Sequence, residues 1–144
     1  MTFDERFETS ASPELAFPYL ANLNNAPAWD PSIPKVEQII PGPVGLGTRF
    51  FVTVRMFGIT NVFEYHVETW EPDRRAVLLG RGTTATATDT IVVTHHGGGS
   101  RVQWTVEVHL RGPLHLVEPV AAVFFKFNVR RAIANLKQKL DQLA

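Results

Sequence analysis

The chain contains no cysteine, carries no net charge and has no apolar run long enough to cross a membrane. The absence of cysteine excludes a disulfide framework, a thiolate metal site and a cysteine nucleophile. Fourteen basic against fourteen acidic side chains leave no overall charge to attract nucleic acid. The longest apolar run, residues 120–125, is far shorter than the roughly 20 residues of a membrane-spanning helix. These absences predict a partner that is small or apolar.

The size and composition predict one globular domain over residues 1–144, since 44% of the residues are hydrophobic and 19% are charged. Charge is nevertheless uneven: residues 1–30 hold five acidic side chains and one basic, whereas residues 113–144 hold five basic and two acidic. The basic segment is interpreted either as a solvated helix end or as a surface for an acidic protein partner. Because the acidic start of the chain does not resemble a secretory signal, a cytoplasmic location is expected.

Hydrophobic periodicity gives the order of elements. Residues 2–9 predict a strand, and a helix follows with Ser12 as its N-cap and Pro13 in its first turn. Beyond Gly47 a period of two predicts successive strands joined by short turns, which must therefore be antiparallel. Residues 114–143 predict one long helix. The fold class is therefore α+β, with this helix lying on an antiparallel sheet.

Two patterns predict which side chains face the interior. Residues 95–100 are interpreted as a glycine-rich hairpin loop. Symmetric pairing across it sets three pairs opposite each other and facing inward: Asp89 with Val106, Ile91 with Trp104, and Val93 with Val102. The long helix carries apolar residues at three- and four-residue steps, predicted to be buried against the sheet: Leu114, Val117, Ala121, Phe124, Phe125, Ala132, Leu136, Leu140 and Leu143.

Several short motifs follow one another along nearly the whole chain. They are Ser12-Pro13-Glu14-Leu15-Ala16-Phe17, Asn25…Trp29-x-Pro31, Gly45-Leu46-Gly47-Thr48-Arg49-Phe50, Val67-Glu68-Thr69-Trp70-Glu71-Pro72, Thr88-Asp89-Thr90 and Gly99-Ser100-Arg101-Val102. Together with the order of elements, they resemble the helix-grip fold of the START and birch-pollen-allergen superfamily, specifically its bacterial polyketide cyclase/dehydrase and lipid-transport group. The resemblance implies a curved antiparallel sheet wrapped around the C-terminal helix, two helices after the first strand, and an apolar cavity between sheet and long helix.

Four polar side chains interrupt the inward-facing apolar positions: Asn61, Tyr65, Asp89 and Asn128. A buried Asp89 either has a structural role, bonding loop amides or pairing with Arg81, or serves a ligand pocket. Tyr65 either packs locally or contacts a ligand, and Asn128 either bonds the sheet or anchors a ligand. With their apolar neighbours they form the candidate ligand-binding set: Asn61, Phe63, Tyr65, Asp89, Ile91, Trp104, Val106, Phe124, Phe125 and Asn128.

The sequence offers few candidate catalytic residues. None of the five histidines is predicted to face inward, so neither a histidine base nor a metal site is expected. No phosphate- or dinucleotide-binding motif occurs, and no cofactor is expected. The cavity is predicted to open near residues 41–47, 82–84 and 112–113, where the backbone cannot form regular pairs.

Three hypotheses for function remain open at the level of sequence. The first is a module that binds or carries a small hydrophobic ligand, either a lipid or an aromatic polyketide-like molecule, in the cavity. The second is a polyketide cyclase or dehydratase in which Asp89 and Tyr65 act as base and acid on a poly-ketone. The third is a protein-interaction domain that uses the basic helix face. Whether the protein is an enzyme therefore stays open.

Overall fold

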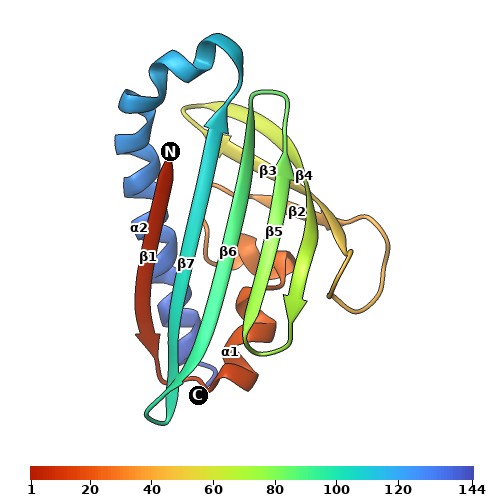
Figure 1. Cartoon of the computed structure of the whole chain (residues 1–144), viewed down its shortest axis with the longest axis vertical. Coiled ribbons are helices and arrows are strands. Elements are labelled where there is room, and N and C mark those ends of the chain that lie inside the picture. The colour runs from red at the N-terminus through yellow and green to blue at the C-terminus, as the bar shows by residue number, and fades with distance from the viewer.

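The protein folds as one seven-stranded antiparallel sheet that curves around a long C-terminal helix (Figure 1), as the computed structural model of residues 1–144 shows. The elements are β1 (Thr2–Thr9), α1 (Pro13–Leu20), the 3-10 helix η1 (Leu23–Ala28), β2 (Lys35–Gln38), β3 (Arg49–Met56), β4 (Ile59–Glu71), β5 (Arg75–Arg81), β6 (Ala85–His96), β7 (Gly99–Leu110), the 3-10 helix η2 (Gly112–Val117) and α2 (Glu118–Asp141). The predicted α+β class and its antiparallel sheet are confirmed. None of the helices combines the length and apolar character needed to cross a membrane.

The strands lie in the order β1-β7-β6-β5-β4-β3-β2, so sequential hairpins build the sheet from β2 to β7 and β1 then closes its far edge beside β7. The predicted register of the last hairpin is confirmed, with Asp89 opposite Val106 and Ile91 opposite Trp104. The predicted loop at residues 95–100 is wrong in extent, because both strands continue until His96 pairs with Gly99. Two glycines are enough to reverse the chain there, since Gly97 adopts a φ of 59°.

The hydrophobic core lies between the concave face of the sheet, the two short helices and the carboxyl half of α2. Its largest side chains are almost completely buried: Phe17, Leu20, Phe50, Leu78, Ile91, Leu136 and Leu140. Each side chain of this size stabilises the fold by about 2 kcal/mol when it leaves water. Ser12 stands at the N-cap of α1 as predicted, but its side chain makes no capping hydrogen bond, so α1 depends on this packing.

The predicted burial of the long helix is right for Ala132, Leu136 and Leu140 and wrong for Leu114, Val117, Phe124 and Leu143, which are exposed. Leu136 and Leu140 are fully buried, whereas Phe124 is 55% exposed and Leu114 is 41% exposed. The α-helix begins only at Glu118, because the preceding residues form η2. From there α2 runs beside β1, at the edge of the sheet, and reaches the core only with its second half (Figure 1).

The carboxyl end of α2 is tied to the start of the chain through Asp141. Its Oδ1 accepts hydrogen bonds from Thr9 Oγ1 at 2.6 Å and from the Ser10 backbone N–H at 3.0 Å, while its Oδ2 accepts one from Lys137 Nζ at 2.9 Å. The hydroxyl of Thr9, followed by the ammonium of Lys137, lowers the pKa of Asp141 to about 2. These bonds therefore stabilise the folded chain only while the carboxyl group is ionised.

Replacing Asp141 by asparagine should lower the free energy of unfolding at pH 6 by about 1–2 kcal/mol, a value reduced because the side chain is 38% exposed. The folded pKa lies below the unfolded one of about 3.9, so this contribution is present above pH 4 and disappears as the pH falls toward 2. Urea denaturation at pH 6 and pH 3 measures the difference. Asp4→Asn, at an exposed carboxylate of β1, is the control. Equal stability of D141N and wild type at pH 6 would contradict the prediction.

Candidate functional site

A small pocket of about 60 Å³ lies under α2, between its middle turns and the sheet. Eight residues line it: Trp29 and Asp30 after η1, Asp89 of β6, Trp104 and Val106 of β7, and Val129, Ala132 and Ile133 of α2. Three members of the sequence-based set, Asp89, Trp104 and Val106, are thus brought together here. The walls are aromatic and aliphatic, and the only ionisable groups among them are the two aspartates.

Asp89 lies in the middle of β6 with its carboxyl group turned into the pocket wall. Its Oδ2 accepts a hydrogen bond from Trp104 Nε1 at 3.0 Å, whereas its buried Oδ1 has no hydrogen-bond partner. Burial raises the pKa of Asp89 to about 6; the Trp104 bond opposes this shift and the nearby charge of Asp30 adds to it. The pairing with Arg81 considered from the sequence is wrong, because Arg81 is exposed and lies opposite Thr86, on the other face of the sheet.

Asp30 supplies the second carboxylate of the pocket. Its Oδ1 accepts hydrogen bonds from the backbone N–H and the hydroxyl of Ser32, at 2.9 and 2.7 Å. Burial raises the pKa of Asp30, while hydrogen bonding from Ser32 and from the Asn128 amide holds it down. Asn128, predicted either to bond the sheet or to anchor a ligand, therefore lies beside Asp30. Sequence reasoning missed Asp30 itself, although it stands in the Trp29-x-Pro31 motif.

Tyr65 of β4 lies close enough for its ionisation to be opposed by both aspartates. Burial raises its pKa well above 10, and the charges of Asp89 and Asp30 add to this effect. Its ring crosses the backbone of β5 at Gly80, where a β-carbon would stand 2.5 Å from Tyr65 Cζ. Glycine is therefore required at this position for the tyrosine to take its place, and the hydroxyl is held neutral near Asp89.

The remaining members of the sequence-based set lie outside the pocket lining. Ile91 is fully buried in the core, and Phe63 packs beside Tyr65 with ring centroids 6.3 Å apart. Asn61 is half-buried on β4, toward the turn that leads to β3. Phe124 belongs to the amino half of α2, and its predicted inward orientation is wrong, as its exposure shows.

Both Phe124 and Phe125 contact the turn between β3 and β4, and the half-buried Phe125 also lies 6.4 Å, between ring centroids, from the buried Phe3 of β1. The ring of Phe57, at the tip of this turn, meets Phe124 edge-on at 5.5 Å between centroids and Phe125 at 6.1 Å. Phe57 has a φ of 57°, a left-handed conformation that costs a non-glycine residue about 1 kcal/mol or more. The turn between β3 and β4 thus contacts α2 through the strained Phe57, and we call its ring contacts with Phe124 and Phe125 the Phe57 bridge.

The placement of the loops bears on the predicted entrance. Figure 1 shows the turn at residues 82–84, η2 and the Phe57 turn at the same end of the molecule, whereas the loop at residues 41–47 projects from the side beside β3 and β4. Two of the three predicted segments therefore cluster near the amino half of α2.

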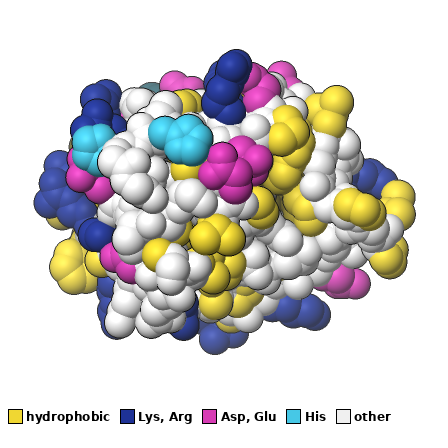
Figure 2. All heavy atoms as spheres, turned by 90° about the horizontal axis from the view of Figure 1, so that it is seen from below, with side chains coloured by type: hydrophobic (Ala, Val, Ile, Leu, Met, Phe, Trp, Pro, Cys, Tyr) yellow, Lys and Arg dark blue, Asp and Glu magenta, His cyan; other side chains and the backbone are white.

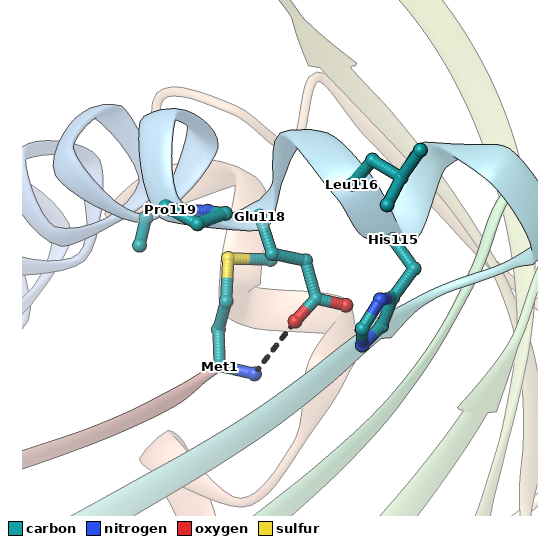
Figure 3. Close-up of a pocket in the computed structure, with 6 residues that line it drawn as sticks. Met1, His115, Leu116, Glu118 and Pro119 are labelled. Carbon is teal, nitrogen blue, oxygen red and sulfur yellow. Dashed lines mark ion pairs between the residues drawn. The ribbon is translucent and has the colours of Figure 1, made fainter.

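A larger open groove of about 470 Å³ lies beside the start of α2 (Figure 3). The Met1 ammonium stands 3.6 Å from Glu118 Oε1 and donates to the Val108 carbonyl at 2.8 Å. Glu118 Oε2 accepts a hydrogen bond from the Leu110 backbone N–H. The Met1 ammonium and the Glu118 carboxylate are therefore both already partnered. For this reason the groove is a weaker candidate for ligand recognition than the pocket under α2.

The histidines of β6 lie at the opposite end of the molecule, remote from the pocket. His95 Nε2 stands 3.4 Å from Glu14, and His96 Nε2 stands 3.1 Å from Glu8. Figure 2, which views this end from below, shows histidine side chains next to acidic ones at the surface. These residues form exposed pairs, and the pocket itself contains no histidine.

Comparison with known proteins places this arrangement in a family. An uncharacterized protein of Mycobacterium tuberculosis, Rv2574, is 28% identical over 143 residues, which are 96% of this chain and 84% of that protein. A START superfamily protein from Mycobacterium smegmatis shares the fold with a TM-score of 0.79 at 16% identity, covering 99% of both chains. The Zhui aromatase/cyclase from Streptomyces sp. R1128 superposes with a TM-score of 0.81 at 13% identity, covering 99% of this chain and 94% of that one.

These structural matches confirm the helix-grip fold expected from the motifs. Residues 1–141 match the sequence model of the family described as polyketide cyclase/dehydrase and lipid transport. The chain belongs to this polyketide cyclase/dehydrase and lipid transport family, whose general role is the binding of hydrophobic ligands.

Proposed function

We propose that the protein binds a small hydrophobic molecule, either a lipid or an aromatic polyketide-like compound, in the pocket under α2. The observation that carries the proposal is the combination of apolar walls with one buried, unpartnered carboxylate oxygen, Asp89 Oδ1. Pockets for small ligands typically consist of apolar walls with a few polar groups that fix orientation. A buried acceptor without a partner is costly in the free protein, and a ligand that bonds it removes that cost.

Binding requires the pocket to enlarge, since 60 Å³ is far below the roughly 300 Å³ or more of typical small-ligand pockets. The two halves of α2 are held differently. Its carboxyl half is fixed by buried Leu136 and Leu140 and by the Asp141 bonds. Its amino half contains no fully buried side chain and is held by the Phe57 bridge, by a Phe3–Phe125 ring contact of 6.4 Å and by the Glu118 bonds to Met1 and Leu110. The amino half of α2 is therefore the part that moves away from the sheet to admit a ligand.

Filling the pocket should abolish binding. Val129→Phe places a ring in the pocket, whereas Val123→Phe places the same ring on the exposed face of the same helix. Neutral apolar and aromatic compounds should raise the melting temperature of wild type and V123F and leave that of V129F unchanged, while nucleotides raise none. A ligand at 100 times its dissociation constant stabilises the native state by about 2.7 kcal/mol. Native mass spectrometry of protein from its own host supplies the cognate compound. Failure of every compound and of host extract to bind wild type would overturn the proposal.

A second candidate function, a polyketide cyclase or dehydratase, is favoured by the proximity of Tyr65 to Asp89, of which Asp89 lines the pocket. Asp89, with a pKa of about 6, is mostly ionised at pH 7 and can accept a proton from a carbon next to a ketone. Tyr65, whose pKa is raised, keeps its proton and can donate it to the carbonyl oxygen. Wild type should catalyse the aldol closure of a poly-ketone chain, and both D89N and Tyr65→Phe should lose this catalysis while ligand binding persists. Closure at the uncatalysed rate in the presence of wild type would exclude the activity.

A further inference from the structure

The pocket contains a second buried polar atom without a partner, and it is a donor. Trp29 Nε1 makes no hydrogen bond, just as Asp89 Oδ1 makes none, and both residues line the same pocket. The wall of one pocket thus holds two residues with unused polar atoms, one an N–H and the other a carboxylate oxygen. Because buried polar groups in proteins are nearly always bonded, two such atoms at one small site point to a molecule that bonds both.

Both groups are fixed in place by the anchored part of the structure. The Trp29 carbonyl accepts a hydrogen bond from Asn135 Nδ2 of α2 at 3.1 Å, and its ring meets Trp104 edge-on at 5.3 Å. Trp104 in turn donates to Asp89 Oδ2. The chain Asn135, Trp29, Trp104, Asp89 therefore connects the carboxyl half of α2 to the middle of β6. Donor and acceptor stay in position while the amino half of the helix opens.

We propose, building on the proposed function, that this pair recognises the hydroxyl group of an otherwise apolar ligand, which donates to Asp89 Oδ1 and accepts from Trp29 Nε1. A hydroxyl is the smallest substituent of an apolar ligand that both donates and accepts, so it can satisfy both atoms at once. A ketone bonds only the indole, an ammonium group bonds only the carboxylate, and a ligand carboxylate meets the charges of Asp89 and Asp30. The ligand therefore enters hydroxyl first, with its apolar body toward Val129 and Ile133.

Matched probes that differ in one group test this assignment. The aromatic set is 2-naphthol, 2-methylnaphthalene, 2-naphthoate and 2-naphthylmethylammonium, and the aliphatic pair is 1-octanol and nonane. The binding of each probe to the full chain is measured by calorimetry at pH 7.5. The hydroxyl probe of at least one set should bind about tenfold tighter than its methyl counterpart, the value expected for a hydrogen bond to a charged group. Which set shows the preference distinguishes a phenolic from an alcoholic ligand.

Two variants remove the proposed partners singly. Trp29→Phe keeps an aromatic ring but removes the N–H, and Asp89→Asn keeps the shape but removes the charge. Both should lose most of the hydroxyl preference while binding the methyl probe as wild type does, which also shows that they are folded. Trp70→Phe, in a tryptophan that packs on Phe17 outside the pocket, should keep the preference.

The outcomes separate this inference from the function on which it rests. Equal binding of hydroxyl and methyl probes, tighter binding of the carboxylate or ammonium probe, or a preference that survives in W29F would each overturn hydroxyl recognition while leaving hydrophobic binding intact. No binding of any probe to wild type, with V129F indistinguishable from it, would overturn both.

Discussion

Leu136→Ala is expected to lower the free energy of unfolding by about 3–5 kcal/mol, the cost of emptying a leucine site in a closely packed core. Leu136 is fully buried at the centre of the carboxyl half of α2, among side chains from α1 and the sheet. Such a loss approaches the whole stability of a domain, commonly about 5–15 kcal/mol. Guanidinium denaturation followed by circular dichroism measures it.

The matched control is Phe127→Ala, nine residues earlier on the same helix. Phenylalanine is the larger side chain, yet this one is 73% exposed, so its loss should change stability by less than about 0.5 kcal/mol. A loss of several kcal/mol in F127A would show that the amino half of α2 packs on the sheet in solution. That result would contradict the opening of the pocket by this half of the helix.

Asp89→Asn is expected to stabilise the protein at pH 7 by up to about 3 kcal/mol. The folded pKa of about 6 exceeds the unfolded one of about 3.9, and each pKa unit corresponds to about 1.4 kcal/mol. The stability associated with the neutral carboxyl group is fully present below pH 3.9 and is lost as the pH rises through 6. Asparagine does not ionise, and its side-chain oxygen can still accept the hydrogen bond from Trp104.

Urea denaturation of D89N and wild type at pH 4, 5.5 and 7 follows this difference, which should be largest at pH 7 and close toward pH 4. The exposed Asp4→Asn serves as the reference for the removal of one negative charge. A D89N protein that is least stable relative to wild type at pH 7 would mean that the ionised carboxylate has a cationic partner. It would remove the base from the cyclase mechanism and the acceptor from hydroxyl recognition.

Sequence alone predicted the sheet side of the site. A period of two and a tight glycine turn determine which residues of β6 and β7 face inward, so the neighbourhood of Asp89, Trp104 and Val106 was predictable. The same alternation of side chains between the two faces also argues against the pairing of Asp89 with Arg81. Arg81 stands opposite Thr86, and Asp89 lies three positions after Thr86 on β6, an odd step that places the side chains of Arg81 and Asp89 on opposite faces of the sheet.

The rest of the site lies where periodicity carries no information. Trp29 and Asp30 follow η1 in irregular backbone, and their position under α2 depends on the Asn135 bond from a segment 106 residues away. The exposure of Phe124 could not be predicted from the sequence for a different reason. An apolar helical stripe shows which face of a helix is apolar, but not how far along the helix the sheet continues to cover that face.

The closure of the sheet by β1 also determines when the fold can be completed. β1 pairs only with β7, and the Thr9–Asp141 bond joins residues 132 positions apart. A chain made from its N-terminus exposes the alternating strand β1 long before its partner is available, while each later hairpin can form from neighbouring segments. Contacts so distant in sequence slow folding because a long loop must close before they form. β1 and the end of α2 should therefore dock last, onto hairpins already assembled.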